Sequence, residues 1–143
     1  MMTLQDNVCG EHELRYWIEQ VNATFTPDGE AVQSTTMRPE QYEHTYLFAV
    51  AKALAPDMDL IHGLLFNLWA GMSTEMHRDV GEFCVCFYPV DAPGAPLRTE
   101  DFGDVEVLAN RVVAFDCTEH THQQVVPVDG PRFSVVFKFR KAG

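Results

Sequence analysis

The sequence predicts a mainly β, α+β protein in which two N-terminal helices precede an antiparallel β roll. Apolar residues repeat with helical spacing as far as Leu54, whereas after Leu60 they fall into short runs rich in Val, Phe, Ile and Leu. Turn residues, and no helical pattern, separate several of these runs, which favours antiparallel strands. The chain has 143 residues, the length of one ordinary domain. We therefore expect a single compact domain over 1–143, with helices over about 11–55 and the roll over about 59–140.

The first helix is expected from about Glu11 to Phe25, because its apolar residues recur at i, i+3, i+4, i+7 and i+11. A second helix is expected to begin near Pro39, since proline suits the first helical position, and to end before Pro56. The apolar stripe of the first helix is Leu14, Trp17, Ile18, Val21 and Phe25, and that of the second is Tyr42, Tyr46, Val50 and Leu54.

Short strands are expected in the rest of the chain, with turns such as Asp129-Gly130-Pro131 between them. Their expected ranges are Leu60–Trp69, Phe83–Tyr88, Asp104–Leu108, Arg111–Phe115, Gln124–Val128 and Arg132–Phe139.

The amino-acid composition and the N-terminal sequence limit the binding partners and the cellular location that we expect for this protein. A net charge of −11 repels phosphate backbones, so neither nucleic acid nor an anionic membrane is an expected partner. An anionic substrate would need a local basic group. The first residues lack a basic segment followed by an apolar one, so we expect a cytoplasmic location and reduced thiols at the four cysteines, 9, 84, 86 and 117.

The residues with the clearest chemical pattern are His77 and Asp79. On an extended chain, side chains at i and i+2 point to the same face, so this pair can hold two neighbouring positions on one metal ion. Two imidazoles and one carboxylate form the facial triad of non-haem Fe(II) oxygenases. The third ligand would be a histidine further along the chain, where His120 and His122 are the two candidates.

The segment Phe115–Ser134 resembles the closing segment of the 2-oxoglutarate/Fe(II)-dependent oxygenases. In that family a strand ending in Phe-Asp is followed by a distal His, a Val-x-Pro-Val-type run, a Gly turn and Arg-x-Ser. The family places its arginine about ten residues after the distal His, and Arg132 lies ten residues after His122. Asn67–Gly71 looks like the family's Asn-x-Tyr strand, and the resemblance extends from roughly Ile61 to Phe139.

The resemblance implies a double-stranded β-helix (jelly-roll) that binds Fe(II) through His77, Asp79 and His122, with His120 as the reserve ligand. It also implies that Arg132 forms a bidentate pair with the distal carboxylate of the co-substrate 2-oxoglutarate.

Three further residues would contact the co-substrate. Ser134, two residues after the arginine, would donate its hydroxyl to the same carboxylate. Asn67 and Trp69 would lie in the co-substrate-binding strand, although Trp69 stands where the family often has tyrosine.

The implied activity is that of an oxidoreductase, a dioxygenase that uses O2 and 2-oxoglutarate and releases succinate and CO2. The expected reaction is hydroxylation of an unactivated C–H bond in a small molecule or an amino-acid side chain, with desaturation and ring closure left open. The alternatives are a cupin-like metal enzyme that does not use 2-oxoglutarate and a non-catalytic jelly-roll binding module. The segment between Asp79 and His122 is short, so we expect little of a lid over the pocket, unless a second subunit of a homodimer completes it.

Overall fold

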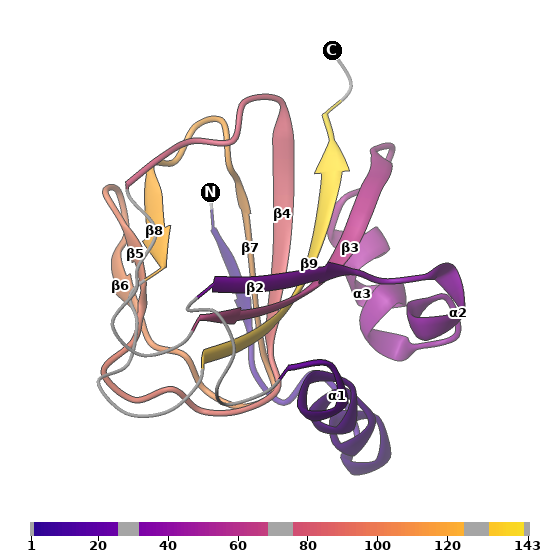
Figure 1. Ribbon diagram of the computed structural model, residues 1–143. Helices are drawn as coiled ribbons and strands as arrows, with labels where there is room; N and C mark the ends of the chain where they lie inside the picture. The colour runs from indigo at the N-terminus through magenta and orange to yellow at the C-terminus, as the bar shows by residue number, and fades with distance from the viewer. Residues whose placement is uncertain (1, 26–31, 69–75, 125–131, 142–143) are drawn as a thin grey trace.

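The computed structural model describes residues 2–25, 32–68, 76–124 and 132–141 (Figure 1). Within these ranges, antiparallel strands form a six-stranded sheet in the order β1-β7-β4-β9-β3-β2 and a three-stranded sheet in the order β6-β5-β8. The elements are β1 (Thr3–Gln5), α1 (Glu11–Thr24), β2 (Val32–Thr36), α2 (Pro39–Tyr42), α3 (Tyr46–Leu54), β3 (Asp59–Leu68), β4 (Glu82–Tyr88), β5 (Leu97–Thr99), β6 (Gly103–Val105), β7 (Arg111–Asp116), β8 (His122–Gln124) and β9 (Arg132–Arg140).

The six-stranded sheet separates two apolar clusters. The helices cover one face, where Trp17 of α1 and Leu47 of α3 are fully buried with residues such as Phe137 of β9. The three-stranded sheet lies on the other side (Figure 1). A second cluster packs on that side, which we call the inner face, and includes Cys86 and Val136. Because strand side chains alternate, every central strand contributes to both clusters.

The first predicted helix is confirmed, but the second is wrong as a single element. Helix α2 ends at Tyr42, and α3 begins at Tyr46, with the Thr45 side chain as its cap, accepting from the Phe48 amide at 3.2 Å. The break rotates the two tyrosines apart, so Tyr42 is buried while Tyr46 is 60% exposed. None of the helices in the described ranges is long and apolar enough to cross a membrane.

The strand predictions are confirmed for β3, β4, β7 and β9, which are the central strands. Three short strands were not expected, namely β1, β2 and β5, because each of them lacks a long apolar run. The predicted strand Asp104–Leu108 is shorter and earlier, at Gly103–Val105. The segment predicted over Gln124–Val128 lies largely outside the described residues.

Asn110 joins the N-terminal segment to the central strands. Its side chain accepts from the Cys9 amide and donates to the Cys9 carbonyl, both at 2.8 Å, and all these groups are buried. Its own amide donates to the carbonyl of Tyr88, the last residue of β4, at 2.7 Å. Its φ of 67° lies in the left-handed region, which asparagine tolerates better than most residues.

We predict that Asn110→Ala lowers the free energy of unfolding by about 2–4 kcal/mol, because it leaves two buried backbone groups of Cys9 unpaired and puts alanine at a positive φ. Asn110→Gly removes the same side-chain hydrogen bonds but accepts the backbone angle, so it should cost less than alanine. Urea unfolding of both variants measures the difference. Equal stability of Asn110→Ala and the wild type would show that these hydrogen bonds contribute nothing.

Candidate metal and co-substrate site

A cavity of about 100 Å³ lies on the inner face of the six-stranded sheet. Its walls combine apolar side chains with a small set of ionisable and hydroxyl groups, as is typical of a small-molecule site. The lining residues are Leu64, Phe66, His77, Asp79, Cys84, Cys86, Phe115, His122, Ser134, Val136 and Lys138.

Backbone hydrogen bonds bring the two parts of the candidate metal site together. His77 and His122 form an isolated antiparallel bridge, in which each amide donates to the other residue's carbonyl at 2.9 Å. The Asp79 amide donates to the carbonyl of Cys117 at 3.0 Å. Residues far apart in the sequence are therefore held side by side by the backbone alone.

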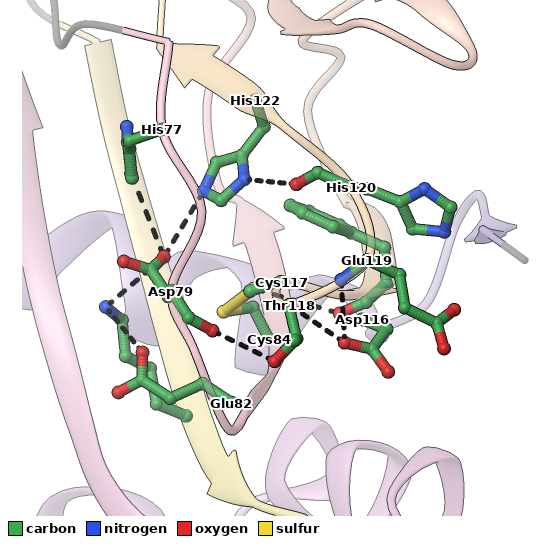
Figure 2. Close-up of polar contacts among 12 residues, drawn as sticks. His77, Asp79, Glu82, Cys84, Asp116, Cys117, Thr118, Glu119, His120 and His122 are labelled. Carbon is green, nitrogen blue, oxygen red and sulfur yellow. Dashed lines mark hydrogen bonds and ion pairs between the residues drawn. A yellow bond between two sulfur atoms is a disulfide. The ribbon is translucent and has the colours of Figure 1, made fainter.

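The side chains of His77, Asp79 and His122 converge at the cavity (Figure 2). One donor atom from each lies within 4.8 Å of the others, and Asp79 Oδ2 is 3.3 Å from His122 Nε2 and 3.8 Å from His77 Nε2. The three side chains are thus close enough to bind one ion. The His122 side chain is 5% exposed and that of His77 is 38% exposed, so the His77 side is the more open to solvent.

The protonation of His122 fits a cation at this position. Its Nδ1 lies 3.0 Å from the carbonyl oxygen of His120, which can only accept, so Nδ1 carries a proton and donates it. In a neutral ring, Nε2 would then present a lone pair to the Asp79 carboxylate. Two lone pairs at 3.3 Å repel each other unless a proton or a metal ion lies between them. Two imidazole nitrogens and one carboxylate oxygen are the donor set of a facial Fe(II) triad, so these residues fit that metal.

The electrostatics of Asp79 favour its ionised form. When no metal is bound, a hydrogen bond donated by His122 holds the pKa of Asp79 below its ordinary value, and partial burial opposes this effect. Lys138 acts in the same direction as His122, with its Nζ 3.9 Å from Asp79 Oδ2 and 3.7 Å from Glu82 Oε2. Lys138 was not among the residues predicted from the sequence, although its place six residues after Arg132 on one strand puts both on the same face.

Arg132 is fully buried on the inner face, two residues before Ser134 on β9. Its Nε donates to the carbonyl of Ala95 at 3.0 Å, but its two terminal guanidinium nitrogens have no partner among the described residues. The guanidinium lies over the ring of Tyr88, 5.2 Å from the centroid. An unpaired buried cation is costly, so this arrangement points to an anion that completes it.

Tyr88 is a second residue of this region that was not predicted from the sequence. Its hydroxyl is buried without a hydrogen-bond partner in the described part of the chain, and burial raises the pKa of Tyr88 to about 12. The phenol is therefore neutral near pH 7 and can donate a hydrogen bond beside Arg132. The alternation of Cys84, Cys86 and Tyr88 on β4 is the sequence signal that could have identified it.

The other predicted site residues lie elsewhere. The His120 side chain points away from the metal ligands in Figure 2 and pairs through Nδ1 with Asp101 Oδ2 at 2.6 Å. Asn67 is buried, but it is absent from the cavity wall that its neighbour Phe66 lines, and its side-chain atoms lack partners among the described residues. The structure therefore does not bring either side chain together with the triad, although the backbone carbonyl of His120 contacts His122. Trp69 lies outside the described residues.

The expectation of four reduced thiols is wrong for two of them. Cys84 of β4 and Cys117, just after β7, form a disulfide with a Cα–Cα distance of 6.2 Å, while Cys9 and Cys86 are free and buried. The expectation rested on the predicted location, and nothing in the local sequence marks this pair, because its members are 33 residues apart.

No family model and no curated protein sequence matches the chain. Solved structures do. A prolyl-4-hydroxylase from Pseudomonas putida is 20% identical, with 98% of this chain and 92% of that chain covered and a TM-score of 0.76. A viral collagen prolyl hydroxylase from Paramecium bursaria Chlorella virus-1, solved as a 2-oxoglutarate complex, is 11% identical over 99% of this chain and 96% of its own, with a TM-score of 0.75.

A third similar structure is the non-haem α-ketoglutarate-dependent epimerase SnoN of nogalamycin biosynthesis. It is 14% identical, with 99% of this chain and 78% of that chain covered and a TM-score of 0.75. α-Ketoglutarate is another name for 2-oxoglutarate. The predicted fold is thereby confirmed: the chain has the double-stranded β-helix fold of the 2-oxoglutarate/Fe(II)-dependent oxygenases.

The geometry predicts which histidine is the third ligand. His122→Ala should weaken Fe(II) binding by more than the ~10–100-fold that loss of an outer-shell partner costs, because it removes a donor atom. His120→Ala should change the affinity by no more than that range, since the backbone carbonyl that orients His122 remains. Anaerobic calorimetric titration of Fe(II) into both variants measures the affinities. Tighter binding by His122→Ala than by His120→Ala would transfer the ligand role to His120.

Proposed function

We propose that this protein is an Fe(II)- and 2-oxoglutarate-dependent dioxygenase that hydroxylates an unactivated C–H bond of a small molecule or an amino-acid side chain. The observation that carries the proposal is the pairing of two features on one inner face. A triad of two imidazoles and a carboxylate lines the cavity. Beyond Ser134 lies a fully buried arginine whose terminal nitrogens have no partner within the described ranges. A metal alone would explain the triad but not the arginine.

Different residues of the site would bind Fe(II) and 2-oxoglutarate. His77, Asp79 and His122 would hold Fe(II), which when bound supplies the activation of O2. The guanidinium of Arg132 would pair with the distal carboxylate of 2-oxoglutarate, and the hydroxyl groups of Ser134 and Tyr88 would donate to the same carboxylate. A dianion would thus be neutralised inside a protein whose overall charge repels it.

The apolar walls of the cavity separate this chemistry from bulk water. Residues such as Phe66, Phe115 and Val136 leave room for few waters besides the bound groups, which strengthens the electrostatic interactions inside. The substrate would enter on the more exposed His77 side, where Met76 and Val80 present apolar side chains to solvent. The overall balance is one C–H bond, one 2-oxoglutarate and one O2 converted to one C–OH group, one succinate and one CO2.

The direct test is succinate formation. Purified protein given Fe(II), 2-oxoglutarate and O2 should release succinate even without substrate, through slow uncoupled turnover, and a mass-spectrometric screen of metabolites should then find a gain of one oxygen. Asp79→Ala, treated in parallel, should form none. Metal binding without any succinate would favour the cupin-like alternative, and the absence of metal binding would favour a non-catalytic module.

We predict that Arg132→Ala weakens 2-oxoglutarate binding by about a hundred- to several-thousand-fold. Loss of one partner of a buried ion pair costs ~3–5 kcal/mol, and ~1.4 kcal/mol corresponds to tenfold. Fe(II) affinity should change little, because Arg132 is not a ligand. The measurement is a titration of 2-oxoglutarate into anaerobic Fe(II) protein, following the visible charge-transfer band of the chelate.

Two variants control this titration. Arg132→Lys should recover part of the loss, since lysine keeps the charge but not the bidentate fork. Arg98→Ala removes an exposed arginine that pairs with Asp104 and should leave the midpoint unchanged. An unchanged midpoint in Arg132→Ala would place the co-substrate anchor elsewhere.

A further inference from the structure

The disulfide between Cys84 and Cys117 lies beside the candidate iron ligands. Cys84 lines the cavity and is 3% exposed, and Cys117 is fully buried. The carbonyl of Cys117 accepts the hydrogen bond from the Asp79 amide, so the backbone that carries one sulfur also positions the carboxylate. Figure 2 shows the cysteine pair close to Asp79, on the side away from His77.

These residues form a second group of potential metal donors. One carboxylate oxygen of Asp79 and the sulfur atoms of Cys84 and Cys117 all lie within 4.8 Å of one another. Two cysteine sulfurs and one carboxylate oxygen are donor types of tetrahedral zinc sites, and reduction of the S–S bond would free both sulfurs to bind an ion. Thiolates favour zinc over the harder cations. Lys138, the register partner of Cys84, places a positive charge beside them, which stabilises thiolates.

We propose that reduced Cys84 and Cys117 form, together with Asp79, a Zn²⁺ site that competes with the iron triad for Asp79. A dithiol reductant opens the disulfide by exchange, yielding two thiols and its own disulfide. Zn²⁺ then displaces one proton from each thiol and binds both sulfurs and the Asp79 carboxylate. The cavity that Cys84 lines gives the ion its path. Exchange with an oxidised disulfide compound, which is reduced to its dithiol, re-forms the Cys84–Cys117 bond, releases Zn²⁺ and leaves Asp79 to the two histidines.

The inference rests on the proposed function only in naming iron as the competitor, and the Zn²⁺ site itself does not depend on it. The two can be tested separately because His77 belongs to the triad but not to the cysteine group. Cys86 provides the matched control. It is a buried free thiol in the same cavity wall, two residues from Cys84 on the same strand, and it is not a member of the group.

The experiment uses Co²⁺ as a spectroscopic substitute for Zn²⁺. Full-length protein is prepared in two forms, one oxidised and one reduced with a phosphine that does not bind the metal. Co²⁺ is titrated into each while the thiolate-to-cobalt charge-transfer band is followed. The reduced wild type should develop this band and lose it when Zn²⁺ is added, whereas the oxidised protein should not develop it.

The variants identify the ligands. Cys84→Ala and Cys117→Ala should each weaken the band or abolish it, and the two changes together should abolish it. Cys86→Ala and His77→Ala should retain it. Asp79→Ala should weaken Co²⁺ binding in the reduced protein by about tenfold or more.

The reduced wild type tests the proposal even if a cysteine variant fails to fold. Absence of the band in the reduced wild type, or its survival when both cysteines are replaced, would overturn the proposal. A clear band in a protein that shows no 2-oxoglutarate-dependent chelate would instead retain the Zn²⁺ site and refute the iron function.

Discussion

The antiparallel bridge between His77 and His122 is the contact on which the arrangement of the site depends. Its two backbone hydrogen bonds join the segment that precedes β4 to the start of β8. The i, i+2 spacing then puts Asp79 on the same side as His77, and the hydrogen bond to Cys117 holds it there. The carbonyl of His120 finally selects the ring nitrogen of His122 that faces Asp79. The donor set is thus oriented mainly by the backbone, which side-chain substitutions in the cavity wall would leave in place.

Strand β9 carries two positively charged residues of the candidate site, Arg132 and Lys138. Arg132, Ser134, Val136 and Lys138 alternate with residues that pack against the helices, so the inner face of this strand carries two cations, one on either side of Ser134 and Val136. Arg132 is fully buried, and its terminal nitrogens have no partner among the residues that the structure describes, whereas Lys138 pairs with Asp79 and Glu82. Arg132 would pair with the proposed dianion, and Lys138 helps to lower the pKa of Asp79, the proposed carboxylate ligand. Such a local positive field would allow an acidic protein to bind the acidic co-substrate that we propose.

The sequence predicted features that depend on local spacing. The amphipathic stripe of α1, the long central strands and the same-face geometry of His77 and Asp79 all follow from periodicity, and the resemblance to the oxygenases supplied the order of the remaining residues. Features that depend on tertiary contact were missed. The break at Thr45 interrupts an apolar pattern that continues across it, and short strands such as β5 exist only because they pair.

In the site, too, features that depend on tertiary contact could not be predicted from local spacing. The local sequence leaves both His120 and His122 as candidates, and the resemblance favours His122. The fold pairs His122 with Asp79 and His120 with Asp101. The disulfide joins cysteines whose proximity results from the pairing of β4 with β7. Asn67 matched a family pattern, but strand alternation places it away from the cavity wall.

The most direct measurement is an anaerobic crystal structure with Mn²⁺, as a redox-inert substitute for Fe(II), and 2-oxoglutarate. We predict metal density bound by His77, Asp79 and His122 and a carboxylate of the co-substrate on the guanidinium of Arg132. Metal held by other residues, or a carboxylate that leaves Arg132 unpaired, would contradict it.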